Sequence, residues 1–483
     1  MINYRKDIDG LRGLSIILVL LFHAKIPFFS GGFLGVDIFF VISGYLITSI
    51  IIKLHKKKKF EINYFYERRI RRIIPALYIV LIFLSLYTFF FQSPYFSKDL
   101  SQSIFFTPIF LQNFLNIYES SQYFNLAYDF KSLGHTWSLS IEEQFYMIYP
   151  IFFLLVLKFF KKYLRYFISL LFIISLIYYL YLGLDGHQQN LLFFFTPSRI
   201  WEILLGCIVA LNFTKVKKPR IINLVAFILI IFPIFLINII DPQYILRILV
   251  VIGASLLLIE TYNVKECLIS KLLKTKYLVF IGIISYSLYL WHVPIYSIYR
   301  DFFTFEQNVY ENLFLITLSI LISYISFKFV ETPFRNSKKI NRKLLYSCFF
   351  SGIIFFTSFG VIGHKLNGFE EIKSNNLPIE KKDFYISFMH EREKLSKFKK
   401  NPKNTNNNHI LVIGDSLAND VVNSLSTQGI FSERLILNGP CFGKLIDNFN
   451  ACGIDLDLLL KKSLNASRVI LSSDFVNEKS QSG

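Results

Sequence analysis

Two ionisable side chains near the N-terminus share one face of an expected helix. Arg12 and His23 lie eleven positions apart in one apolar run. Eleven helical steps of about 100° return to within about 20° of the same face, about 16 Å along the axis. A guanidinium can hold a phosphate or thioester oxygen by a forked contact, and a neutral imidazole can take a proton or carry an acyl group. In the alternative without function, Arg12 reaches lipid phosphate and His23 satisfies a hydrogen bond in the core.

A carboxylate stands at the start of the next apolar segment. Asp37 lies in a glycine-punctuated stretch over residues 31–47. We expect Asp37 to orient His23. The alternative is an acid that is stabilised by the helix macrodipole, with glycines that only permit close packing.

Four arginines cluster where a further apolar segment begins. They are Arg68, Arg69, Arg71 and Arg72. Together they could hold the phosphates of a nucleotide-bearing donor. Equally, they could anchor the chain to anionic lipid at the cytoplasmic face.

Three more stretches place polar groups at the boundaries of apolar runs, over residues 135–146, 285–294 and 331–333. Their tryptophans and tyrosines could belong to the aromatic belt of a membrane interface. The adjacent Glu142 and Glu143 enter an apolar segment, so at least one of them must face the protein interior.

The composition indicates which elements position these residues. Hydrophobic residues make up 53% of the chain and aromatic residues 18%, far more than in a soluble protein of this length. The pattern predicts a mainly α fold, a polytopic bundle of about 10 + 1 transmembrane helices. The apolar runs are centred near residues 20, 42, 82, 147, 172, 206, 230, 250, 287, 321 and 354.

The net charge of +19 fits basic loops beside a membrane, and we expect no nucleic acid as a partner. Lysines and arginines concentrate in alternate loops, beginning with residues 53–72. The positive-inside rule therefore predicts a cytoplasmic N-terminus and, after about eleven crossings, a C-terminal part outside the cytoplasm.

The chain divides into a membrane domain at residues 1–340, a further transmembrane helix at 341–364, a polar linker at 365–408 and a partial α/β domain at 409–483. We expect strands at 409–413 and 468–471 in the last part. About 75 residues are few for a three-layer fold.

Two cysteines, Cys441 and Cys452, fall in the part that is expected outside the cytoplasm. A disulfide can persist there, and we expect these two to form one. No metal site is expected.

These motifs, in this order, resemble the acyltransferase-3 family of membrane acyltransferases, which includes O-antigen and peptidoglycan O-acetylases. The resemblance spans residues 5 to 335, and further matching stretches are 198–202 and 290–292. It implies transfer from a cytoplasmic acyl-CoA, usually acetyl-CoA, to an acceptor on the other face, with Arg12 and His23 essential.

The site residues that follow fall into three groups. We expect His23, Arg12, Asp37 and Glu142 in catalysis, the four arginines at the acyl-CoA, and, at the substrate, His135, Trp137, Glu143, His292 and Glu331. The donor is a substrate, and no permanently bound cofactor is expected.

The turn at Gly414-Asp415-Ser416 resembles longer family members in which an SGNH (GDSL-like) domain is fused outside the membrane. Ser416 matches the serine nucleophile of that domain. Such a site needs a histidine near its end, and none follows His409. Without a base Ser416 is a poorly activated alcohol, so we expect a truncated or degenerate domain, in which His409 or His390 could stand in.

The expected function is transfer of an acyl group, acetyl by the resemblance, to a hydroxyl of a cell-envelope carbohydrate. The acceptor would be O-antigen lipopolysaccharide, exopolysaccharide or peptidoglycan at the bacterial inner membrane. A transporter or flippase is the alternative of another class, but no inverted repeat is evident. An esterase or transferase working through the outer domain alone is a third, and the missing histidine opposes it.

Overall fold

The computed structural model describes residues 4–120, 131–211, 220–239, 243–259, 268–302 and 308–374, and three strands at 410–414, 432–436 and 468–472. The chain divides into two units, Met1–Glu371 and Ile372–Gly483.

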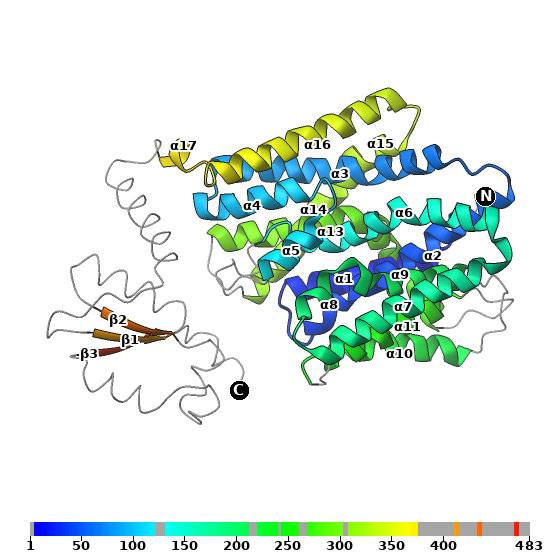
Figure 1. The fold of residues 1–483 in the computed structure, drawn as a ribbon, viewed down its shortest axis with the longest axis horizontal. Helices are drawn as coiled ribbons and strands as arrows, with labels where there is room; N and C mark the ends of the chain where they lie inside the picture. Colours follow the sequence, from blue (N-terminus) through cyan, green and yellow to red (C-terminus); the bar gives the residue numbers. More distant parts are fainter. Residues whose placement is uncertain are drawn as a thin grey trace. The chain divides into compact units, whose positions relative to one another are not determined.

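The first unit is a bundle of helices that run in roughly one direction or its reverse (Figure 1). Its longer helices are α1 (Lys6–His23), α2 (Gly35–Lys56), α3 (Ile62–Phe90), α6 (Trp137–Phe159), α7 (Leu164–Asp185), α9 (Thr196–Leu211), α10 (Arg220–Leu236), α11 (Gln243–Leu258), α13 (Lys276–Phe302), α14 (Val309–Ser326) and α16 (Arg342–Lys365). Shorter elements connect them: η1 (Ser30–Leu34), α4 (Pro94–Phe106), α5 (Gln112–Ser120), η3 (Gly134–Thr136), η4 (Lys161–Tyr163), α8 (Gln189–Phe194), α12 (Leu268–Leu273), the π-helical η5 (Phe327–Glu331), α15 (Thr332–Arg335) and α17 (Glu370–Ser374).

Each apolar run corresponds to one of the longer helices. Within the described residues, eight spans are long and apolar enough to cross a membrane, and α10 and α11 are apolar but shorter. α1 carries charged residues in its first two turns. The prediction of a polytopic helical membrane bundle is confirmed.

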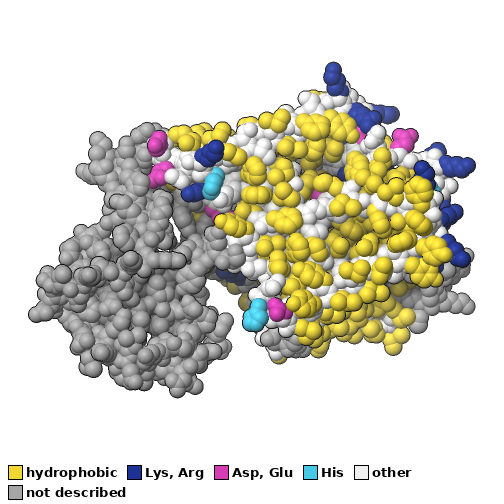
Figure 2. Space-filling view, in the orientation of Figure 1, with side chains coloured by type: hydrophobic (Ala, Val, Ile, Leu, Met, Phe, Trp, Pro, Cys, Tyr) yellow, Lys and Arg dark blue, Asp and Glu magenta, His cyan; other side chains and the backbone are white. Residues whose placement is uncertain are grey.

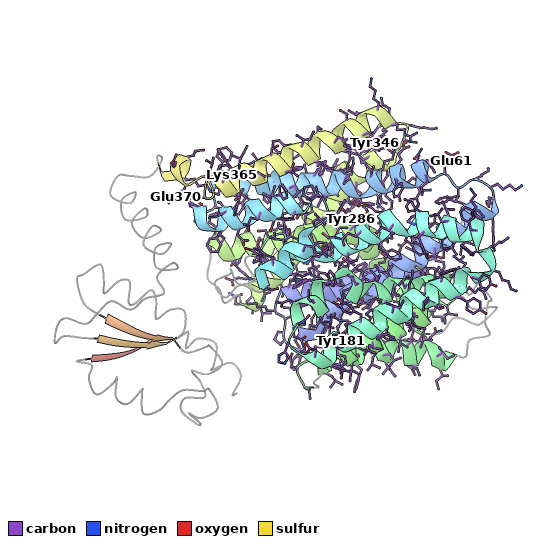
Figure 3. The ribbon with its side chains drawn as sticks, in the orientation of Figure 1. Glu61, Tyr181, Tyr286, Tyr346, Lys365 and Glu370 are labelled. Carbon is purple, nitrogen blue, oxygen red and sulfur yellow. The ribbon has the colours of Figure 1, made fainter. Side chains whose placement is uncertain are left out.

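The surface of the bundle suits lipid. Figure 2 shows hydrophobic side chains over most of the visible face, with Lys and Arg mainly at one end. On α7, Leu170, Ile174 and Ile177 are more than half exposed. In Figure 3, Tyr181 of α7 lies at the outer surface and Tyr286 of α13 inside the bundle. Large apolar side chains on a continuous outer face indicate that hydrocarbon surrounds these helices.

α1 and α13 pack so closely that their backbones touch. A Cβ atom on Gly13 would lie 2.1 Å from the carbonyl oxygen of Leu278, and one on Gly282 would lie 1.7 Å from that of Asp9. Glycine is required at such crossings because any side chain would push the helices apart. These contacts fix how α1 lies along α13, and so where Arg12 stands.

The second unit contains a parallel sheet of three strands in the order β2-β1-β3. β1 (Ile410–Gly414) and β3 (Arg468–Ser472) confirm the two predicted strands, and β2 (Ser432–Ile436) was not predicted. Ile410 aligns with Ser432 on one side and Arg468 on the other. Parallel strands in this order require crossover connections, which is typical of α/β folds.

Three predicted functional positions of this unit, Ser416, Cys441 and Cys452, lie outside the described residues. The nucleophile and the disulfide therefore stay predictions.

Candidate active site

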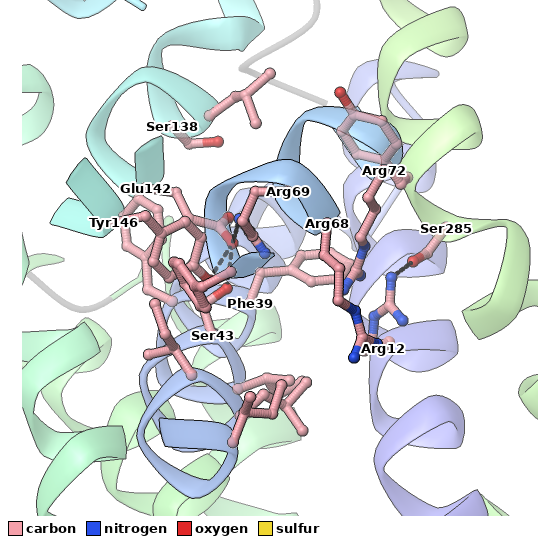
Figure 4. A pocket seen from close by; sticks show the side chains of 18 of the residues that line it. Arg12, Phe39, Ser43, Arg68, Arg69, Arg72, Ser138, Glu142, Tyr146 and Ser285 are labelled. Atoms are coloured by element: carbon pink, nitrogen blue, oxygen red, sulfur yellow. Dashed lines mark hydrogen bonds and ion pairs between the residues drawn. The ribbon is translucent and has the colours of Figure 1, made fainter. Parts of the chain in front are cut away.

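A cavity of about 210 Å³ opens between α1, α2, α3, α6 and α13 (Figure 4). One face of α2, from Val36 to Leu54, forms a largely apolar wall. Ser43 is the polar residue of that face, and the other elements contribute Arg12, Glu61, Tyr64, Arg68, Arg69, Arg72, Ser138, Glu142, Tyr146, Ser285, Tyr286 and Tyr289. We call this space the arginine cavity.

Arg12 is held at the cavity wall by α13. Its Nη2 donates a hydrogen bond to Ser285 Oγ at 2.8 Å, and its Nη1 lies 3.4 Å from Asp9 Oδ1. Its side chain is 14% exposed. The guanidinium keeps further donors, because five N–H groups are available and these two contacts use two of them.

Arg68 and Arg72 join Arg12 on the same side of the cavity (Figure 4). Arg72 lines the cavity, and within the described residues its charge interacts with the cations Arg12, Arg69 and Arg335 and with the carboxylate of Glu331. The Arg68 guanidinium lies 5.8 Å from the centre of the Tyr64 ring. Four arginines line the cavity against two glutamates, Glu61 and Glu142, and this excess of positive charge makes the cavity suited to an anion.

The structure brings three of the four predicted arginines to the cavity and places Arg71 elsewhere. Its Nε and Nη2 donate to Glu67 Oε1 at 2.9 and 2.8 Å, and its Nη1 donates to the carbonyl oxygen of Ile340 at 2.8 Å. Helical geometry explains the difference. Positions 68, 69 and 72 fall within about 100° of arc, whereas position 71 falls outside it and faces Glu67 four residues earlier.

Glu142 and Glu143 both point inward, as their position in an apolar segment predicts. Glu142 lines the cavity and accepts hydrogen bonds from Ser43 Oγ and, at 2.6 Å, from the Tyr146 hydroxyl. Glu143 accepts from Arg69 Nη2 at 2.5 Å. The Arg69 guanidinium lies 3.8 Å from the centre of the Tyr146 ring. Two carboxylates therefore lie near Arg69, and Arg12 has a longer contact with one, Asp9.

His23 is the last residue of α1. Its Nδ1 lies 3.0 Å from the carbonyl oxygen of Val19. A carbonyl can only accept, so Nδ1 carries the hydrogen and Nε2 presents its lone pair. Arg300 of α13 donates from Nη2 to the His23 carbonyl oxygen at 2.9 Å.

Two more histidines lie beside His23. The ring centre of His292 (α13) is 5.0 Å from that of His23, and the ring centre of His135 (η3) is 5.2 Å from that of His292. His292 is fully buried and His135 nearly so. We call these three residues the histidine cluster. It joins a residue expected in catalysis with two expected at the substrate.

Tyr289 belongs to the wall between the arginine cavity and the histidine cluster. It lines the cavity, and its ring centre lies 5.0 Å from His135 and 5.8 Å from His292. Its hydroxyl donates to the His135 carbonyl oxygen and lies 2.7 Å from Ser138 Oγ. On the single helix α1, Arg12 thus faces the arginine cavity and His23 belongs to the histidine cluster on the other side of this wall.

Residues 5–328 match the sequence model of the acyltransferase domain family, acyltransferase-3. The chain belongs to this family. The resemblance seen in the motifs is confirmed, and the match includes both the arginine cavity and the histidine cluster.

The relatives of this acyltransferase-3 chain include named O-acetyltransferases. It is 32% identical to the peptidoglycan O-acetyltransferase OatA of Listeria monocytogenes, over 70% of this chain and 57% of that protein. It is 33% identical to the O-acetyltransferase OatA of Staphylococcus aureus, over 69% and 57%. A putative O-acetyltransferase of Staphylococcus aureus is 31% identical over 88% and 76%. The chain thus spans little more than half the length of the first two. No solved structure matches.

In this acyltransferase-3 chain the structure gives Asp37 two arginine partners, and its expected role in orienting His23 stays a prediction. Asp37 forms an ion pair with Arg199 and lies 3.5 Å from Arg247 Nε, and Arg199 Nη1 lies 3.3 Å from Glu202 Oε1. His23 instead is oriented by the backbone of its own helix. The buried guanidinium groups of Arg199 and Arg247 need a negative charge nearby, and the Asp37 carboxylate supplies it.

Sequence reasoning missed the roles of Arg199, Glu202 and Arg247. All three are buried, and with Asp37 they link α2, α9 and α11. Each of the three is an ionisable residue inside an apolar run, and that pattern alone could have marked them as candidates.

Two of the expected substrate residues have other partners. Trp137 packs among aromatic rings, with its ring centre 4.9 Å from that of Phe193. Glu331 is fully buried, accepts from Ser287 Oγ at 2.9 Å and pairs with Arg335. Contact of Trp137, Glu143 and Glu331 with substrate stays a prediction, as does catalysis by Glu142.

Proposed function

We propose that this chain is a membrane O-acyltransferase that moves an acetyl group from cytoplasmic acetyl-CoA to a hydroxyl of a cell-envelope carbohydrate. The observation that carries the proposal is that Arg12 and His23, on the same helix α1, face two different sites. Arg12 faces a cavity with more arginines than carboxylates, and His23 faces a buried cluster of imidazoles. Membership of the acyltransferase-3 family and the names of its relatives support acyl transfer.

The donor site is the arginine cavity. Phosphate groups of acetyl-CoA bind Arg68 and Arg72, which reach the cavity from α3. The apolar face of α2 runs from Val36 to Leu54, which is 19 residues and about 27 Å of helix. That length accommodates an extended, largely uncharged arm that ends in the thioester. Arg12 Nη donors bind an amide carbonyl of this arm as it passes, which directs the thioester toward His23.

His23 supplies acid–base chemistry at the thioester carbon. The thioester must pass the wall that includes Tyr289 and Ser138, so the Tyr289 side chain moves when the donor binds. The acceptor oxygen forms a bond to the acyl carbon, the C–S bond breaks, and the hydroxyl proton ends on the CoA sulfur. His23 stands beside this path with a basic Nε2.

The chain is proposed to lie in the bacterial inner membrane with its N-terminus in the cytoplasm and the second unit outside. The gathering of Lys and Arg mainly at one end of the bundle supports this orientation (Figure 2). Peptidoglycan is the proposed acceptor because the Listeria monocytogenes relative bears that substrate in its name.

Reconstituted vesicles test the function. The full chain in lipid vesicles, given labelled acetyl-CoA on one side and soluble peptidoglycan fragments on the other, should produce acetylated fragments. The His23→Gln variant should produce none. Two results would refute the proposal. One is labelled acetyl-CoA that crosses the membrane unchanged and forms no ester on the glycan; the other is glycan without label for both the natural chain and His23→Gln.

A further inference from the structure

The histidine cluster brings together three imidazoles from three separate elements. His23 ends α1, His135 lies in η3 and His292 lies within α13. Adjacent ring centres are 5.0 and 5.2 Å apart. No group of three or more His, Cys, Asp or Glu in the described residues has a geometry that could hold a metal ion. Closely spaced imidazoles are suited to acid–base chemistry, because each can take up or release a proton near neutral pH.

The tautomers of two of these rings are fixed in the same sense. His292 Nδ1 lies 3.0 Å from the carbonyl oxygen of Leu288, as His23 Nδ1 does from that of Val19. Each Nδ1 therefore carries a hydrogen, and each Nε2 offers a lone pair. Two basic nitrogens on neighbouring rings can exchange one proton, whereas two buried imidazolium ions at this spacing would repel each other.

Several polar atoms of the cluster have no partner within the described part of the chain. They are His292 Nε2, both ring nitrogens of His135, and the hydroxyl of Tyr296, whose ring centre lies 6.4 Å from that of His292. His292, His135 and Tyr296 are at most 3% exposed. Buried polar atoms are normally hydrogen-bonded, so their concentration here points to a hydroxyl-bearing ligand that completes them.

We propose that His292 is a second acid–base residue of the transfer and binds the acceptor hydroxyl. This inference rests on the proposed function. It assigns removal of the acceptor proton to His292 and delivery of a proton to the CoA sulfur to His23. His292 Nε2 takes the proton as the acceptor oxygen bonds to the acyl carbon. That proton passes from His292 to Nε2 of neutral His23. His23 then gives it to the departing CoA sulfur as the C–S bond breaks, and both rings end neutral, as they began.

His135 and Tyr296 hold the acceptor in this scheme. Their unpartnered polar atoms face neither bulk water nor a protein group within the described residues. A sugar presents several hydroxyls at once, each able to donate and accept, and so fits a site with a hydroxyl and two imidazoles. The acceptor site is thus distinct from the arginine cavity and lies behind the wall that includes Tyr289.

Two substitutions at His292 separate its base from its packing. His292→Asn keeps an amide N–H near the position of Nδ1, able to donate to Leu288, but removes Nε2. His292→Gln places a non-basic amide near Nε2. We expect either variant to transfer acetyl to glycan about 100-fold more slowly than the natural protein, with an unchanged KM for acetyl-CoA. His187→Gln, at an exposed histidine between α7 and α8, is the matched control.

Hydroxylamine gives the deciding readout, because this neutral nucleophile attacks a thioester before it must lose a proton. In the His292 variants we expect acetylhydroxamate formation from acetyl-CoA at close to the natural rate, while transfer to glycan is lost. Equal loss of both products, or no loss of either, would overturn the inference. If the natural protein acetylates neither acceptor, the proposed function itself fails, and that outcome is distinct.

Discussion

Arg300 of α13 binds the carbonyl oxygen of His23, the last residue of α1, at 2.9 Å. The same helix binds Arg12 through Ser285 and places His292 beside His23. With the glycine contacts that press the two backbones together, α13 sets the position of both functional residues of α1. The pair of helices, rather than α1 alone, is the unit that builds the site.

Because Arg300 holds the end of α1, its substitution should displace His23 and so lower the activity. Arg300→Gln removes a charge-assisted hydrogen bond to a helix C-terminus, which contributes about 1.5–3 kcal/mol. We expect kcat to fall with little change in the KM for acetyl-CoA, and the free energy of unfolding to fall by a similar amount. Arg342→Gln serves as the control, since that side chain is 57% exposed and its ion pair is weak. Natural kcat in Arg300→Gln would contradict this role.

Arg71 and Arg72 are neighbours in sequence with opposite predicted effects. Arg72→Gln removes a cation from the cavity, so we expect the KM for acetyl-CoA to rise roughly 10- to 100-fold with thermal stability unchanged. Arg71→Gln leaves buried Glu67 without its main partner, so the free energy of unfolding should fall by about 3–5 kcal/mol. Kinetics and thermal unfolding of the two purified variants check both statements. The reverse pattern would refute the assignment.

Asp37 is predicted to act on stability. Asp37→Asn leaves Arg199 and Arg247 with less negative charge in a buried site, which should lower the free energy of unfolding by about 3–5 kcal/mol. Arg247→Met in the same chain should recover part of the loss, because it removes one cation. Denaturation of the single and double variants in detergent measures this. A fully stable Asp37→Asn protein with no activity would instead restore Asp37 to the orientation of His23.

Outside the candidate spans, Glu119 of α5 predicts a dependence of stability on pH. Burial and the nearby Asp99 carboxylate raise the pKa of Glu119, although Lys131 Nζ lies 2.5 Å away. A raised pKa means that the folded protein binds the proton more tightly than the unfolded chain does. Stability should therefore fall as pH rises from the unfolded pKa to the folded one. Melting temperatures across pH 5 to 8 should show this slope, and Glu119→Gln should flatten it. An unaltered slope in Glu119→Gln would assign it to other groups.

The sequence was sufficient to predict the elements that depend on local or periodic patterns of apolar residues. Spanning length predicted each long helix, and the spacing of Arg12 and His23 placed both on α1, which begins at Lys6 and ends at His23. Strands β1 and β3 followed from short apolar runs. β2 did not, because its sequence Ser-Glu-Arg-Leu-Ile lacks the apolar run of a buried strand.

Partners that are distant in sequence could not be predicted. Asp37 lies close to His23 in the chain, and that proximity suggested a pairing, whereas the structure pairs Asp37 with Arg199. His135 and His292 were expected at the substrate, but no periodicity relates them to His23. Their meeting depends on how η3 and α13 pack against α1, and packing between helices is set by tertiary contacts that a single sequence does not reveal.

The central claim is that His23 carries out acyl transfer in the membrane unit. Its most direct test is mass spectrometry of envelope glycan from cells that make the natural chain, His23→Gln, Ser416→Ala or His187→Gln at equal levels. We predict an acetyl mass on the glycan that is lost only with His23→Gln. An acetyl mass that persists in full with His23→Gln would contradict the account.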